Sequence, residues 1–117
     1  MMEPMDISAC EIVSVCQREE LAPGEMRLVQ PPDHGPIAVY NVAGEYYATD
    51  DFCTHGQASL SQEGLLDGHV VECSWHLGSF DVRDGQPVAP PCQIALRTYP
   101  IVFEGDTVCV KLDRREN

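Results

Sequence analysis

Residues 53–76 read CTHGQASLSQEGLLDGHVVECSWH, a stretch that begins and ends on a pair of metal-binding side chains. The first pair is Cys53 and His55, the second is Cys73 and His76, and 17 residues separate His55 from Cys73. Each pair offers one thiolate and one imidazole. A metal centre that takes two sulfurs on one side and two nitrogens on the other would use this set of donors. The four residues are therefore the candidate ligands of one centre.

Short strands separated by tight turns are predicted along most of the chain. Apolar and polar residues alternate with period 2, and no long helical periodicity appears. The predicted strands are Ile12–Cys16, Met26–Val29, Ile37–Val42, Glu45–Thr49, Gly64–Leu66, His69–Glu72, Ser79–Asp81, Ile94–Leu96, Pro100–Phe103 and Thr107–Leu112. Hairpin turns are predicted at Ala43-Gly44, Asp67-Gly68, Asp84-Gly85 and Gly105-Asp106. This rhythm predicts an all-β fold, either a sandwich or a barrel.

Both ligand pairs fall in predicted loops. The segment from Gly64 to Glu72 lies between them and is a predicted β-hairpin, which would bring the two loops face to face. A glycine follows each histidine within two residues, at Gly56 and Gly78. Glycine lets backbone N–H groups approach the sulfur atoms of a metal centre closely. The spacing therefore has a geometric reason as well as a chemical one.

The length of the chain limits it to one domain. With 117 residues and 44% hydrophobic content it can bury one core, but it is too short for two ordinary domains. No apolar stretch is long enough to cross a bilayer. The N-terminus is acidic and lacks the basic and then apolar layout of a signal peptide. A cytoplasmic protein is expected.

The charge is strongly acidic, with 19 Asp and Glu against 7 Lys and Arg and a formal net charge of -12. Nucleic acid and anionic membrane surfaces are therefore not expected partners, because binding them requires cations. Two interpretations of the acidity stay open. It serves solubility alone, or it steers the protein toward basic docking surfaces and raises encounter rates.

Other polar and sulfur-bearing side chains are expected to have no part in metal binding. Asp50 and Asp51 precede the first pair, and we expect them to lie in a solvated loop. The remaining cysteines are not expected to bind the metal; all but Cys92 are expected to be structural, and Cys109, in an alternating strand, is predicted to be a small buried hydrophobe. They are Cys10, Cys16, Cys92 and Cys109.

The two ligand boxes resemble the Rieske family, and the resemblance extends from about Ala38 to Leu112. The boxes match its C-x-H and C-x-x-H pattern, and the second continues through Phe80 and Asp81 to Gly85 as in the family. The resemblance implies one domain over residues 1–117 with a Rieske-like fold of antiparallel sheets. In that fold, two loops form a small cluster-binding subdomain, here at about residues 50–92. It also implies one 2Fe-2S cluster held by Cys53, His55, Cys73 and His76.

Among Rieske proteins, this chain is most similar to the small ferredoxins of bacterial aromatic-ring-hydroxylating dioxygenase systems. That similarity implies an electron carrier and not an enzyme. The carrier would take single electrons from a flavin-dependent reductase and pass them to a terminal oxygenase.

The chain departs from the high-potential members of the family at four positions. Those relatives have a disulfide where this chain has Ala58 and Trp75, and a serine and a tyrosine where it has Gly78 and Phe80. Neither Gly78 nor Phe80 offers a hydroxyl to a cluster or ligand sulfur, so the reduced state gains less stabilisation. We expect a potential toward the low end of the Rieske range of roughly −150 to +300 mV.

Three other interpretations stay open at this point. A structural zinc site also uses two Cys and two His, although zinc fingers usually pair Cys with Cys and His with His. The chain could instead be the small Rieske subunit of another oxidoreductase such as nitrite reductase. It could also be an enzyme in its own right, although its length leaves little room for a catalytic domain.

Overall fold

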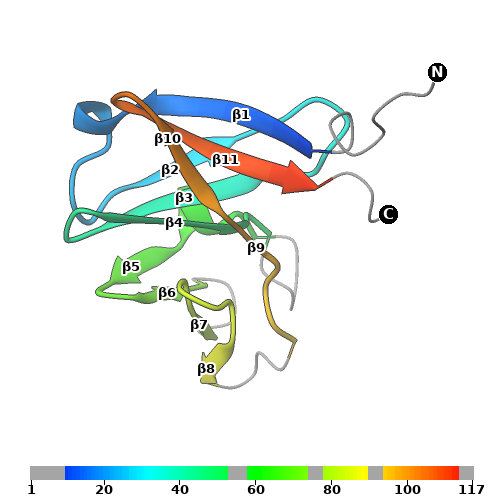
Figure 1. Cartoon of the computed structure of the whole chain (residues 1–117). Helices are drawn as coiled ribbons and strands as arrows, with labels where there is room; N and C mark the ends of the chain where they lie inside the picture. The colour runs from blue at the N-terminus through cyan, green and yellow to red at the C-terminus, as the bar shows by residue number, and fades with distance from the viewer. Residues whose placement is uncertain (1–9, 53–57, 74–77, 90–93, 114–117) are drawn as a thin grey trace.

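The computed structural model describes residues 10–52, 58–73, 78–89 and 94–113. These residues form short antiparallel strands joined by turns, with two helices of one turn each (Figure 1). In chain order the elements are β1 (Cys10–Gln17), the 3-10 helix η1 (Arg18–Glu20), β2 (Met26–Val29), β3 (Ile37–Val42), β4 (Glu45–Asp50), α2 (Leu60–Glu63), β5 (Leu65–Asp67), β6 (Val70–Glu72), β7 (Ser79–Asp81), β8 (Pro87–Ala89), β9 (Thr98–Tyr99), β10 (Ile101–Glu104) and β11 (Thr107–Asp113).

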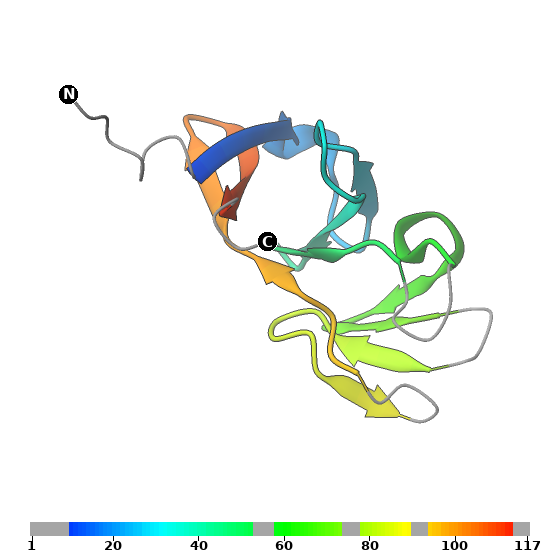
Figure 2. The same ribbon diagram turned by 90° about the vertical axis from the view of Figure 1, so that its right-hand side faces the viewer.

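The strands make three sheets. One has the order β1-β11-β10, a second has the order β2-β3-β4-β9, and a third has the order β5-β6-β7-β8. The first two curve toward each other to form a base, and the third lies to one side of it (Figure 2). All paired strands are antiparallel. The predicted all-β fold, with a base and a smaller subdomain, is confirmed.

Strand β3 lies between the core of the base and the core of the third sheet. All six of its residues are buried, as its nearly continuous apolar sequence indicates. Because successive side chains point to opposite faces, Ile37 and Val39 pack into the core of the base. Ala38, Tyr40 and Val42 pack into the core that also contains Cys73. One strand therefore anchors the subdomain to the base.

The structure corrects three details of the predicted strands. Residues 94–96 form no strand; the N–H of Leu96 instead donates to the carbonyl of Gly85 at 2.8 Å. Strands β8 and β9 were missed because three and two residues are too few to display an alternation. Strand β5 begins at Leu65 because Gly64 caps α2, donating its N–H to Leu60 O at 3.0 Å.

Candidate metal centre

The second ligand pair belongs to a hairpin made by β6 and β7. Val71 faces Phe80 and Glu72 faces Ser79 in this hairpin. One step further, the backbone N–H of Cys73 donates to the carbonyl of Gly78 at 2.7 Å. Cys73 is therefore the first residue of the connection between β6 and β7, and its bond to Gly78 closes that connection. His76 lies within the same connection in sequence. His76 itself lies outside the described residues.

The first ligand pair lies between two backbone contacts that close its segment. Phe52 and Ser59 form an isolated antiparallel β-bridge. Beside it, the N–H of Leu60 donates to the carbonyl of Asp51 at 2.7 Å. Cys53 and His55 fall between these contacts in sequence and lie outside the described residues.

Asp51 is buried, and the expectation that it lies in a solvated loop is wrong. Its side chain is 1% exposed. One carboxylate oxygen accepts a hydrogen bond from the Ser59 hydroxyl at 2.5 Å, and the other accepts one from the Ser61 N–H at 2.8 Å. These donors follow it by 8 and 10 residues, so no local pattern marks the burial. Its neighbour Asp50 is half-buried and accepts a hydrogen bond from the Tyr99 hydroxyl at 2.5 Å.

The described ends of the two ligand segments meet in one core. Ala58, at the end of the first segment, and Cys73, at the start of the second, are both buried in the apolar cluster around Phe80. Burial in apolar surroundings keeps water away from the Cys73 sulfur, as suits a ligand to an iron–sulfur centre. The predicted hairpin between the segments is confirmed as β5 and β6.

The residues present fit a centre of two sulfurs and two nitrogens. Of the four predicted ligands only Cys73 is described, and its environment is that of a sheltered thiolate donor. Within residues 10–52, 58–73, 78–89 and 94–113, no three His, Cys, Asp or Glu side chains gather as a metal site. The described part of the chain therefore provides no competing metal site.

Two of the other cysteines are structural, as predicted. Cys16 and Cys109 are buried in strands of the base, and burial raises the pKa of the Cys16 thiol. The side chains of Cys10 and Cys92 lie outside the described residues. Raised pKa and burial make a thiol a poor nucleophile, so the Cys16 thiol is expected to be inert.

Apolar side chains at the margins of the ligand segments were missed by sequence reasoning. Phe52 is 45% exposed immediately before the first pair, and Ile94 is 67% exposed. A cavity of about 280 Å³ adjoins Phe52 and is also lined by His34, Arg97 and Tyr99. Neither alternation nor a motif distinguishes these residues in the sequence. The exposure of Phe52 places an apolar side chain next in sequence to the first ligand pair.

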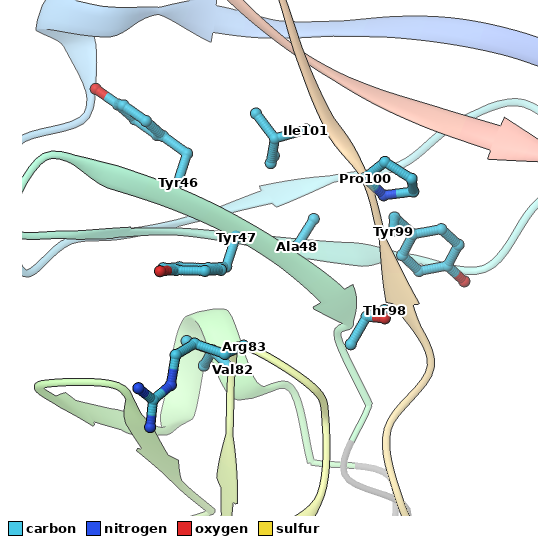
Figure 3. Close-up of a pocket in the computed structure, with 9 residues that line it drawn as sticks. All are labelled: Tyr46, Tyr47, Ala48, Val82, Arg83, Thr98, Tyr99, Pro100 and Ile101. Carbon is cyan, nitrogen blue, oxygen red and sulfur yellow. The ribbon is translucent and has the colours of Figure 1, made fainter.

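A second cavity, of about 380 Å³, lies where the base meets the subdomain (Figure 3). Tyr47 of β4 lines it, with Arg83 from the turn after β7. The Arg83 guanidinium donates to the Asp81 carboxylate at 2.8 Å and lowers the pKa of that group. Tyr47 donates its hydroxyl to Glu45 at 2.7 Å. Both of these polar side chains therefore have hydrogen-bond partners, and Cys73, the predicted ligand that the structure describes, is not among the residues that line the cavity.

No helix among the described residues is long and apolar enough to cross a membrane.

A family model described as the Rieske [2Fe-2S] domain matches residues 11–100. The ferredoxin component of the p-cumate 2,3-dioxygenase system of Pseudomonas putida is 44% identical over 110 residues, which cover 94% of this chain and 92% of that protein. The biphenyl dioxygenase ferredoxin subunit of Pseudomonas sp. (strain KKS102) is 48% identical over 99 residues, covering 85% and 90%.

Solved structures share this fold. A chain in the complex of reduced oxygenase and oxidized ferredoxin in carbazole 1,9a-dioxygenase superposes with a TM-score of 0.82 and 41% identity, covering 85% of this chain and 91% of that one. A structure described as an NADH-dependent nitrite reductase small subunit from Mycobacterium tuberculosis superposes with a TM-score of 0.77 at 17% identity, covering 87% and 95%. At that identity the second likeness shows the fold alone.

Proposed function

The chain belongs to the family of Rieske [2Fe-2S] domains, and from that membership we propose that Cys53, His55, Cys73 and His76 hold its one Rieske-type cluster. In such a cluster two histidines replace two cysteines on one of the irons. The four side chains supply this set, two thiolates and two imidazoles. The observation that supports the assignment best is Cys73, whose buried thiol shares one core with the end of the first ligand segment.

The protein is an electron carrier of the ferredoxin type and not an oxygenase itself, since its relatives of matching length are ferredoxin components of dioxygenase systems. The cluster supplies one-electron redox chemistry when bound. Phe52, next to Cys53 in sequence, is 45% exposed and offers an apolar side chain to an approaching partner. It passes single electrons to a terminal aromatic-ring-hydroxylating dioxygenase.

The partners in this proposal are that oxygenase and a flavin-dependent reductase. The likeness to a ferredoxin solved in complex with its oxygenase supports the first. The reductase rests on the resemblance to multicomponent systems. With a net charge of -12, the chain is suited to basic docking surfaces, which would speed short-lived encounters. A cytoplasmic location belongs to the same proposal, and cell fractionation tests it.

The cluster assignment is tested by replacing one ligand and one matched cysteine. Cys73→Ala should abolish the visible absorption of the cluster and the EPR signal of the dithionite-reduced protein. Cys109→Ala should keep both, because Cys109 is equally buried but lies in β11 of the base. A Cys73→Ala protein with the full signal would overturn the ligand assignment. A colourless wild-type protein that contains zinc would overturn the cluster itself.

Electron delivery is tested separately with purified components. Reduced protein mixed with a terminal oxygenase and its aromatic substrate should give hydroxylated product, and Cys73→Ala should give none. Stable co-purification with a large subunit of another oxidoreductase, such as nitrite reductase, without transfer to any aromatic oxygenase would favour that alternative instead.

A further inference from the structure

Asp51 is the one acidic side chain that is buried among the described residues. Burying a carboxylate is costly unless hydrogen bonds compensate for the lost water. Asp51 makes four such bonds with its side chain and backbone. Its oxygens accept from Ser59 and Ser61, its carbonyl accepts from Leu60 at 2.7 Å, and its N–H donates to Pro36 O at 3.0 Å.

These bonds span the first ligand pair. Asp51 stands two residues before Cys53, and Ser59 stands four residues after His55. The bonds from Ser59, Leu60 and Ser61 hold the far end of the segment, while the bond to Pro36 ties the near end to the start of β3. Fixing both ends of a short segment strongly restricts the conformations open to it. The segment between these two ends contains Cys53 and His55 in sequence.

Asp51 also helps to cap α2, which has a single turn. Ser59 accepts a hydrogen bond from the Gln62 N–H at 3.3 Å, and Asp51 accepts from the N–H groups of Leu60 and Ser61. Because Asp51 precedes the first ligand pair and α2 follows it, the same bonds join the two ends of the ligand segment.

We infer that Asp51 is a positioning residue for the electron-transfer centre, because its buried carboxylate joins the near end of the segment that carries Cys53 and His55 to Ser59 and Ser61 at the far end. The inference rests on the proposed ligand set. Both carboxylate oxygens act as acceptors.

Two substitutions test the role of the carboxylate. Asp51→Ala removes the bonds to Ser59 and Ser61, so the reduced protein should show altered EPR g-values and lose its cluster on the order of ten times faster. Asp51→Asn keeps an acceptor for Ser61 and offers an amide to Ser59, so it should keep the g-values.

Asn41→Ala is the matched control for general destabilisation. Asn41 is a buried polar residue of β3 that bonds Leu21 and Gly44, away from the ligand segments. It should lower stability without changing the g-values. If Asp51→Ala behaves like Asn41→Ala, losing stability with unchanged g-values, the positioning role is overturned.

Two further outcomes are decisive. If Asp51→Ala does not fold, Ser59→Ala replaces it, which removes the 2.5 Å bond together with the bond from the Gln62 N–H: shifted g-values support the inference, and unchanged ones overturn it. A wild-type protein without a Rieske EPR signal would defeat the proposed function before any Asp51 variant is measured, so the two failures are distinguishable.

Discussion

Replacing Gly85 by alanine should destabilise the subdomain, because the backbone of Leu96 lies against this glycine. A Cβ atom at Gly85 would lie 2.1 Å from the Leu96 carbonyl oxygen and 3.1 Å from its carbonyl carbon. Both are backbone atoms, so no side chain can rotate away. Gly85 also has φ of 77°, in the left-handed region that alanine adopts only at a cost. The substitution therefore combines a steric overlap with a backbone penalty.

The magnitude follows from three contributions. The left-handed conformation costs about 1–2 kcal/mol for a residue with a Cβ. Moving Leu96 breaks the 2.8 Å hydrogen bond from its N–H to Gly85 O, and such a bond contributes about 0.5–1.5 kcal/mol. Leu96 is buried in the core that contains Cys73, and full burial of a leucine contributes about 1.5–3 kcal/mol, part of which is lost. The total is about 3–4 kcal/mol.

Gly68→Ala is the matched control. Gly68 has φ of 60° in the β5–β6 turn, but an added Cβ there meets nothing within 4 Å. It should lose only the backbone contribution of about 1–2 kcal/mol. The difference between the two variants isolates the contact with Leu96.

The assay is thermal unfolding of the cluster-loaded protein followed by far-ultraviolet circular dichroism without oxygen. All variants are heated at one scan rate, because cluster loss makes the transition irreversible. At about 4–8 °C per kcal/mol for a small domain, Gly85→Ala should lower Tm by at least about 12 °C and Gly68→Ala by about half as much. Equal Tm values for the two variants would refute the reasoning from the Leu96 contact.

Three further predictions concern a buried amide, the cluster environment and alkaline pH. Asn41→Ala leaves the Leu21 carbonyl and the Gly44 N–H without their side-chain partner, so it should lower the free energy of unfolding by about 2–3 kcal/mol; a urea midpoint equal to wild type would contradict this. Phe80→Tyr restores the hydroxyl that high-potential relatives place near sulfur, so protein-film voltammetry should give a more positive midpoint than wild type, and Phe80→Leu should not. Burial raises the pKa of Tyr40 and of Tyr99 above the ordinary value of 10. The unfolded chain therefore loses these protons at lower pH than the folded chain does. The stabilisation is fully present below pH 10, and the free energy of unfolding should fall as the pH rises above 10. Tyr40→Phe should reduce the slope of stability against pH in that range, and an unchanged slope would show that Tyr40 does not contribute.

Local sequence predicted the elements whose signals lie in neighbouring residues. The strands Met26–Val29 and Ile37–Val42 have their predicted bounds, because alternation or a continuous apolar run marks each of them. Gly44, Gly68, Gly85 and Gly105 adopt the positive φ expected from their turn positions. The ligand pairs were recognisable for the same reason, since donor type and spacing are local properties.

Tertiary structure alone decided the features that join distant residues. Asp51 looks like part of an acidic, solvated loop in sequence, yet donors from the turn beyond the ligand pair make it a buried anchor. The sequence of residues 94–96 predicts a strand. In the structure the Leu96 backbone lies against Gly85 and donates a hydrogen bond to its carbonyl, and these residues form no strand. Composition and periodicity describe only what each residue prefers beside its neighbours. The packing of the whole chain determines which groups meet across a core. That packing brings Asp51 to Ser59 and Ser61, and Ala58 to the core that contains Cys73.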